Sequence, residues 1–162
     1  MAKKRLTHID SKHRAKMVNV SEKGITYRKA VASCTVTMKP GTFKLLKLNK
    51  LPKGDVLEVS RIAGINAAKL THLLIPLCHP LSITGVSVEL RFQPPKRVII
   101  TATAEAIDRT GVEMEALTAV AVAGLAVYDM CKAVDKAVVI GDIKLLFKSG
   151  GKSGIYESVL VR

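Results

Sequence analysis

Residues 84–107 have the sequence TGVSVELRFQPPKRVIITATAEAI, and this stretch decides the fold class. Residues 98–107 alternate apolar with small or polar side chains, which is typical of a β-strand with one buried face. The segment PPKR favours a turn. The first half shows the same alternation, and one face of it carries Val86, Val88, Leu90 and Phe92. The stretch therefore predicts an antiparallel β-hairpin.

The chain before this hairpin predicts one strand and two helices. Residues 26–38 are rich in β-branched side chains and predict a strand, which Pro40 would end. Because proline is tolerated in the first turn of a helix, Pro40 can instead open a short helix over 41–49. Asp55 is a suitable N-cap for a helix over 56–75, where apolar residues recur at helical spacing until the next proline.

The chain after the hairpin predicts one long helix and two more strands. Residues 112–134 are almost continuously apolar, which indicates a helix that must be covered on all sides. We expect another subunit to supply part of this cover, because the chain has only 162 residues. A strand over 136–147, the loop KSGGKSG and a last strand over 155–161 follow. The resulting order β-α-α-β-β-α-β-β favours an α+β fold with helices packed on one face of an antiparallel sheet.

The composition indicates a single domain. We expect it over 17–162, after a flexible basic segment over 1–16 that is poor in large apolar residues. That segment lacks the apolar core of a signal peptide, and no apolar run approaches the roughly 20 residues that span a bilayer. Cys34, Cys78 and Cys131 form no CxxC pair, which fits free thiols in a reducing compartment. We therefore expect a cytoplasmic protein without a membrane partner.

Positive charge is concentrated in the first part of the chain. The formal net charge is +13, and residues 1–53 hold 14 Lys and Arg against only Asp10 and Glu22. This asymmetry indicates an anionic partner, whether a nucleic acid, a membrane surface or a phosphorylated metabolite, although a solvated basic face explains it equally well. Three Tyr, three Phe and no Trp leave little for stacking on bases. We expect no nucleic-acid partner and keep a small basic nucleic-acid-binding module as the alternative hypothesis.

Asp129 and Lys132 interrupt the apolar run AVAVAGLAVYDMCKAV, which spans residues 119–134. Three residues apart on a helix, they project from one face and can form an ion pair. An ordinary surface pair, at the place where the helix reaches solvent, is one interpretation. If the pair is enclosed, its desolvation is costly, and neighbouring charge shifts the two pKa values in the way that a general acid and base require.

His79 lies in the segment LIPLCHPL, whose prolines make the backbone stiff and extended. A histidine held on such a loop, shortly after a helix that carries Lys69 and His72, is a candidate acid, base or phosphate ligand. A partly buried histidine without a chemical role is the alternative. Cys78 and His79 lack the spacing of zinc ligands, so no metal site is expected.

Two further groups of polar residues flank the long helix. Glu113 and Glu115 fall in its first turn, where the helix dipole favours negative charge, and carboxylates can also accept hydrogen bonds from the N–H edge of a guanine-like ring. The glycines of KSGGKSG, with Lys148 and Lys152, suit an anion, although a flexible basic loop tip is the alternative. Glu115 and Asp129 are separated by about 21 Å along one helix. They serve one substrate only if the substrate is long or if two subunits share the site.

Three long motifs of this chain resemble the MoaC family of molybdenum cofactor biosynthesis: KGDVLEVSRIAGINAAKLTHLLIPLCHPL, TGVEMEALTAVAVAGLAVYDMCKAV and KSGGKSG. The resemblance runs from about Leu6 to Glu157. It implies a ferredoxin-like α+β fold and a homohexamer, a trimer of dimers with active sites at the dimer interface. It also implies a pyrophosphate-releasing lyase, which converts a cyclised dihydroguanosine triphosphate (3′,8-cyclo-7,8-dihydro-GTP) into a tricyclic pyranopterin that carries a cyclic phosphate.

The resemblance also implies which residues act. The implied catalytic residues are Asp129, Lys132, Lys69 and His79. The implied substrate-binding residues are Leu77, Cys78, His79, Glu113, Met114, Glu115 and Lys148. The motifs require no cofactor, and Mg²⁺ bound with the triphosphate stays open. Asn19 is a departure, because the family commonly has an aspartate in this segment, and asparagine keeps hydrogen bonding but takes up no proton.

Overall fold

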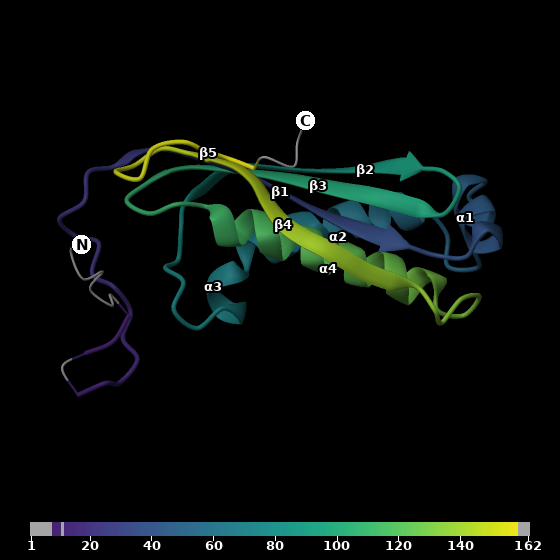
Figure 1. The fold of residues 1–162 in the computed structure, drawn as a ribbon, viewed down its shortest axis with the longest axis horizontal. Coiled ribbons are helices and arrows are strands. Elements are labelled where there is room, and N and C mark those ends of the chain that lie inside the picture. The colour runs from purple at the N-terminus through teal and green to yellow at the C-terminus, as the bar shows by residue number, and fades with distance from the viewer. Residues whose placement is uncertain (1–7, 11, 159–162) are drawn as a thin grey trace.

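The computed structural model describes residues 8–10 and 12–158, and over these residues five strands form one antiparallel sheet in the order β2-β3-β1-β4-β5 (Figure 1). The strands are β1 (Thr26–Thr37), β2 (Ile83–Gln93), β3 (Arg97–Asp108), β4 (Val139–Ser149) and β5 (Tyr156–Glu157). The helices are α1 (Pro40–Lys47), α2 (Val56–Lys69), α3 (Thr71–Leu74) and α4 (Glu113–Cys131). The helices pack on one side of the sheet, so the predicted α+β class is confirmed, and the arrangement is consistent with a ferredoxin-like unit.

The predicted hairpin consists of β2 and β3. In its register Val88 pairs with Ala102 and Leu90 pairs with Ile100. Val88 and Ile100 are both almost fully buried, as the alternating pattern requires. Strand β1 pairs with β3 along its whole length and with β4 on its other side, so it occupies the centre of the sheet.

Alternate residues of the two central strands face the helices and form the core. On β1 they are Ala30, Ala32, Cys34 and Val36, and on β3 they are Val98, Ile100, Ala102, Ala104 and Ala106. Each buried valine or isoleucine contributes about 1.5–3 kcal/mol to folding. The many alanines on this face have short side chains, so helix α4 can lie close to the sheet.

Helix α4 is covered by the sheet on one side and by α2 of the same chain on another. At Gly64 a Cβ atom would lie 2.9 Å from the Ala119 carbonyl oxygen, so the close approach of α2 to α4 requires glycine there. At Gly124 a Cβ atom would lie 2.9 Å from the Ile140 side chain of β4. The cover that we expected from another subunit therefore comes in part from the same chain, while Leu125 stays 57% exposed.

By length and composition alone, α4 is also able to cross a membrane. The expectation that no apolar run approaches that length is therefore wrong for this helix. Its packing is nevertheless that of a core helix, because 56% of its apolar stretch is buried inside the protein, against the sheet and α2.

The helix that we expected after Asp55 begins as predicted but ends early. The Asp55 side chain accepts a hydrogen bond from the Glu58 backbone N–H (3.1 Å), which confirms the N-cap. The helix is interrupted at Leu70, and α3 follows as a separate helix. The Thr71 hydroxyl donates to the Ala68 carbonyl oxygen (3.0 Å), and such local hydrogen bonds compete with the regular helical pattern.

The last two strands differ from their predicted bounds. The strand expected over 136–147 spans 139–149, and its pairing with β1 is irregular near Ala32. Such an irregularity breaks the period of two, so the sequence pattern does not reveal the strand ends. The strand expected over 155–161 is observed as the two-residue β5, and 159–162 lie outside the described residues.

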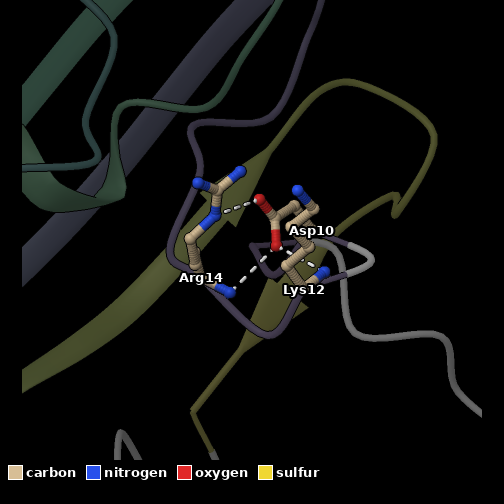
Figure 2. Close-up of polar contacts among 3 residues, drawn as sticks. All are labelled: Asp10, Lys12 and Arg14. Carbon is tan, nitrogen blue, oxygen red and sulfur yellow. Dashed lines mark hydrogen bonds and ion pairs between the residues drawn. The ribbon is translucent and has the colours of Figure 1, made fainter.

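The Asp10 carboxylate organises the described part of the N-terminal segment, as Figure 2 shows. It accepts hydrogen bonds from the backbone N–H groups of Lys12 (2.8 Å) and Arg14 (2.9 Å) and from the Arg14 side-chain Nε (2.9 Å). These bonds, led by that of the Arg14 backbone, hold the pKa of Asp10 below its usual value. The flexibility of residues 1–16 stays a prediction, and 1–7 and 11 lie outside the described residues.

Candidate functional site

The predicted site residues fall at the two ends of α4. Helices α2 and α4 run antiparallel, because Gly64 approaches Ala119 near the middle of both helices, whereas Lys53, just before α2, contacts Asp129 near the end of α4. Glu113 and Asp129 lie at opposite ends of α4, which has 19 residues.

A pocket of about 430 Å³, which we call the His79 pocket, lies at the start of α4. The residues implied by the motifs P-L-C-H-P and V-E-M-E come together in its wall: Leu77, Cys78, His79, Glu113, Met114 and Glu115. The rest of the wall was not predicted, and it consists of His8, Val18, Val20, Lys23, Leu81, Thr110 and Gly111. The N-terminal segment, the loop between α3 and β2 and the start of α4 thus form one pocket.

The His79 ring is held by the N-terminal segment. Its Nε2 lies 2.7 Å from the Val18 backbone carbonyl oxygen. Because a carbonyl oxygen only accepts hydrogen bonds, Nε2 donates, and the neutral ring keeps its free lone pair on Nδ1. The Asn19 side chain accepts a hydrogen bond from the Ser21 backbone N–H (2.8 Å). Asn19 therefore shapes the turn that follows the Val18 contact.

Glu115 is the buried carboxyl group of the His79 pocket, with 3% of its surface exposed. Burial, opposed by a backbone hydrogen bond and assisted by the charge of Glu113, raises the pKa of Glu115 to about 7. Near neutral pH the group therefore exchanges between a carboxyl that donates a hydrogen bond and a carboxylate that only accepts. Burial, and then the charge of Glu115, also raise the pKa of the Cys78 thiol, so this cysteine is protonated at neutral pH.

Glu115→Gln is expected to change how stability depends on pH. Folding raises the pKa of Glu115 from 4.5 to about 7, so its contribution to the free energy of unfolding is fully present below pH 4.5 and is lost as the pH rises through about 7. Because glutamine does not titrate, the stability of the variant relative to the unmodified chain should increase over this interval in urea unfolding. Glu89→Gln, at an exposed position of β2, is the control. The same pH dependence in both variants would contradict the burial of a titrating carboxyl.

A second pocket of about 670 Å³, which we call the Lys148 pocket, adjoins the first. The two pockets share the wall residues Lys23, Thr110, Gly111 and Glu113. The carboxylates in the wall of the Lys148 pocket belong to Glu22 and Glu113, and its basic side chains are Lys23, Arg28, Arg109, Lys148 and Lys152. The excess of basic over acidic groups makes this pocket suitable for an anion.

Lys148 connects the glycine-rich loop with the start of α4. Its ammonium contacts the Ser153 hydroxyl and lies 3.8 Å from a carboxylate oxygen of Glu113. The side chain of Lys148 is only 16% exposed, so its charge is less screened by water than that of a lysine on an open surface. The predicted Lys148 and the predicted Glu113 are therefore neighbours, although the sequence places them in separate motifs.

Arg28 lies in the wall of the Lys148 pocket. Its guanidinium is buried, and Nε and Nη2 donate to the backbone carbonyl oxygens of Asp108 and Arg109 at 3.2 Å each. Gly151, with a φ of +72°, lies against the guanidinium, and a Cβ atom there would overlap Nη1. The second glycine of KSGG therefore allows the loop to approach Arg28.

The sequence analysis missed Arg28, although the pattern contains a signal for it. Arg28 occupies the register of β1 that continues with the buried residues Ala30, Ala32, Cys34 and Val36. A charged residue in the buried register of a strand must find polar partners, so it is a functional candidate on physical grounds. Lys23 and Arg109, which also line the Lys148 pocket, follow from no comparable pattern.

At the other end of α4, Asp129 lies between two lysines, and we call these three residues the Asp129 cluster. Asp129 Oδ1 is 2.7 Å from Lys132 Nζ, and Oδ2 is 2.7 Å from Lys53 Nζ. The hydrogen bonds from Lys132 and then Lys53 lower the pKa of Asp129 to about 2, and the hydrogen bond with Asp129 raises the pKa of Lys132. At neutral pH Asp129 is therefore ionised and Lys132 is protonated.

The Asp129 cluster is not enclosed within one chain. The side chains of Asp129 and Lys132 are 51% and 52% exposed, as the surface-pair interpretation predicts. The sequence analysis missed Lys53, which reaches Asp129 from 76 positions away. Its place in LPKGD, between two predicted helices, carries no periodic signal of this contact.

Lys69 lies in the wall of neither pocket. It is exposed at the end of α2, about 7.5 Å along the helix beyond Gly64, toward the Glu113 end of α4. The structure thus brings seven predicted residues to the two adjoining pockets: Leu77, Cys78, His79, Glu113, Met114, Glu115 and Lys148. It places Asp129 and Lys132 at the opposite end of α4.

Comparisons with known proteins agree on one family. The family model described as MoaC family matches residues 17–151. A cyclic pyranopterin monophosphate synthase of Pelotomaculum thermopropionicum is 56% identical over 153 residues, which cover 94% of this chain and 90% of that protein. A protein of the same name from Parvibaculum lavamentivorans is 54% identical over 159 residues, which cover 98% of this chain and 99% of that protein. The similarity extends over nearly the whole chain.

Proposed function

The chain belongs to the MoaC family, and from this premise we propose that it is a cyclic pyranopterin monophosphate synthase of molybdenum cofactor biosynthesis. Its substrate is 3′,8-cyclo-7,8-dihydro-GTP, and its products are cyclic pyranopterin monophosphate and pyrophosphate. The observation that carries the proposal is the identity of 54% and 56%, over almost the full length, with two proteins of that name. Neither relative supports the alternative of a basic nucleic-acid-binding module.

The Lys148 pocket is suited to the triphosphate group. Phosphate oxygens need positive charge and N–H donors, which the basic side chains of this pocket provide. The buried guanidinium of Arg28 and the largely buried ammonium of Lys148 are the strongest candidates, because both are held away from bulk water. The glycine-rich loop lies against Arg28, and glycines let an anion approach the backbone N–H groups closely.

The adjoining His79 pocket is suited to the ring system of the substrate. Glu113 and Glu115 can accept hydrogen bonds from the N–H edge of a guanine-derived ring, and Leu77 and Met114 add apolar contact. The free Nδ1 of His79 can take up or return a proton. The shared boundary of the two pockets allows one molecule to place its ring in one and its phosphates in the other.

The Asp129 cluster supplies proton transfer in this proposal. Lys132 is protonated and Asp129 is ionised, so Lys132 acts as the acid and Asp129 as the base. The ion pair moves both pKa values away from neutrality, which makes each group weaker in its role until the pair is broken. The two groups titrate together: once Lys132 gives up its proton, the charge that lowers the pKa of Asp129 is reduced, so Asp129 becomes a stronger base. Lys53 remains beside Asp129 and limits this change. Lys69 is a further proton donor or acceptor at the exposed end of α2.

A second subunit is needed to bring the cluster to the pockets. Glu115 and Asp129 are about 21 Å apart along α4, too far for both to contact one small group. We therefore propose active sites at a dimer interface, within a homohexamer that is a trimer of dimers. Exposed apolar side chains on the helices support burial against another chain, and they include Val59, Ile62, Leu73 and Leu125.

The proposed reaction closes a cyclic phosphate. A hydroxyl of the ribose-derived part attacks the innermost phosphorus and passes its proton to a general base. As the new P–O bond forms, the bond to pyrophosphate breaks, and basic side chains stabilise the charge on the leaving group. The protein is then a phosphorus–oxygen lyase that acts in the cytoplasm.

Incubation of the purified protein with 3′,8-cyclo-7,8-dihydro-GTP tests this function. Pyrophosphate and a tricyclic pterin should appear in equal amounts, as measured by a coupled pyrophosphate assay and by chromatography of the oxidised pterin. Unmodified GTP is the control and should release no pyrophosphate. Failure to form both products contradicts the proposal. Tight binding of duplex DNA with a steep salt dependence would instead support the nucleic-acid-binding module.

A further inference from the structure

Asp135 is a buried carboxylate that lines neither pocket and does not contact Asp129. The residue is 1% exposed. Its Oδ2 accepts hydrogen bonds from the Lys39 backbone N–H (2.9 Å) and the Thr42 hydroxyl (3.1 Å), and its Oδ1 accepts from the Ala137 backbone N–H (3.0 Å). Hydrogen bonds to an ionised carboxylate are stronger than those between neutral groups. Asp135 therefore holds three partners in place and is itself inaccessible to a substrate.

These hydrogen bonds replace the cap that α1 lacks. Lys39 is the N-cap residue of α1, and its own side chain makes no capping hydrogen bond. Asp135 lies 96 positions further along the chain and supplies a carboxylate at the positive end of the α1 dipole. The pKa of Asp135 is lowered, and the hydrogen bond from the Lys39 N–H is the largest cause. The carboxylate is therefore ionised at neutral pH. The turn after α4 is thereby tied to the start of α1.

The two segments that Asp135 joins, the turn after α4 and the start of α1, both lead to the Asp129 cluster. On one side, Lys132 precedes Asp135 by three residues, and the turn between them is closed by the hydrogen bond from the Asp135 N–H to the Cys131 carbonyl oxygen (2.9 Å). On the other side, α1 leads into the segment that carries Lys53, whose ammonium returns to Asp129 at 2.7 Å. The contacts form a closed loop, in which Asp135 joins the two segments that carry the lysines.

We propose that Asp135 is a positioning residue, which fixes the geometry of the Asp129 cluster by holding α1 against the turn after α4. It acts through the placement of Lys53 and Lys132. The effect on catalysis rests on the proposed function, whereas the effect on geometry does not. An NMR titration tests the effect on geometry, and enzyme kinetics test the effect on catalysis, both on the full-length protein.

The geometry is tested by NMR titration of the Asp129 carboxyl. The charged and titratable groups around it are Lys53, Lys132 and, beside Lys132, Tyr128. Asp135→Ala is expected to raise the pKa of Asp129 from about 2 toward 3.8, because the lysines are no longer held beside it. Asp135→Asn keeps one acceptor oxygen and should raise it less. An unchanged pKa of Asp129 in Asp135→Ala would overturn the inference.

Kinetics test whether the geometry matters for the reaction. Asp135→Ala is expected to lower kcat by about tenfold or more, as small misplacements of catalytic groups do. KM should change much less, because both pockets lie at the other end of α4. Added to Lys53→Ala, the same substitution should have a smaller effect on kcat than it has alone, because one of the two lysines that Asp135 places is already missing.

Ile100→Val is the control for lost stability, because it weakens the buried core of β3 at a residue that takes no part in the Asp135 hydrogen bonds, and it should leave kcat unchanged. Independent, multiplicative losses in Asp135→Ala and Lys53→Ala, or an equal loss in Ile100→Val, contradict a positioning role. If the unmodified protein forms no product, the proposed function fails, and the titration of Asp129 still decides whether Asp135 sets the geometry.

Discussion

Asp129→Asn is expected to lower kcat for pyrophosphate release by about 10²- to 10⁴-fold, the range in which positioned acids and bases act. Asparagine has nearly the shape of aspartate but takes up no proton, and it removes the charge that raises the pKa of Lys132. KM should change far less than kcat, because the pockets for ring and phosphates do not include this end of α4. Steady-state kinetics with 3′,8-cyclo-7,8-dihydro-GTP measure both constants.

Asp142→Asn is the matched control for this prediction. Asp142 is exposed on β4, and its φ of 50° is a conformation that asparagine adopts readily. The same chemical change is therefore made without strain, and kcat should stay within about twofold of that of the unmodified protein. Comparable losses of kcat in both variants, or an effect of Asp129→Asn on KM alone, would argue against proton transfer by Asp129.

The parts of the fold that could be predicted have local signals. The β2–β3 hairpin shows a period of two on both sides of a proline turn, and the Asp55 cap lies directly before its helix. The interruption at Leu70 depends on the carbonyl oxygens to which Thr71 donates, and the cover of α4 depends on the approach of α2 at Gly64. The first is a local side-chain contact that the apolar periodicity does not record, and the second is a tertiary effect, which overrides local propensity.

The candidate site also combines residues that local motifs predict with contacts that only the fold creates. Short motifs identified Cys78 and Glu115 separately, but only the fold places them in one pocket wall. Lys53 contacts Asp129 across 76 positions, and no spacing rule predicts such a contact. Arg28 is an intermediate case, because a lone charge in the buried register of β1 is visible in the sequence, whereas its backbone partners are not.

Arg28→Gln is expected to raise KM for the triphosphate substrate by about 10- to 100-fold, the loss that follows from removing one or two hydrogen bonds to a charged group. The Arg28 guanidinium is buried in the wall of the Lys148 pocket, so its attraction to phosphate is weakly screened by solvent. Glutamine can still donate to one of the carbonyl oxygens that Arg28 holds, but it carries no charge. The value of kcat should change less than KM.

Lys29→Gln is the matched control, because it removes the same charge from the next residue of β1, on the opposite face of the sheet. There the Lys29 ammonium lies 3.1 Å from a Glu105 carboxylate oxygen and lines neither pocket. Its KM should stay within about twofold of that of the unmodified protein, and thermal unfolding of both variants checks that the sheet is intact. Both variants have the same net charge, so a difference in KM reports the position of the charge. Equal increases of KM would show that overall positive charge attracts the substrate and that Arg28 makes no specific contact with phosphate.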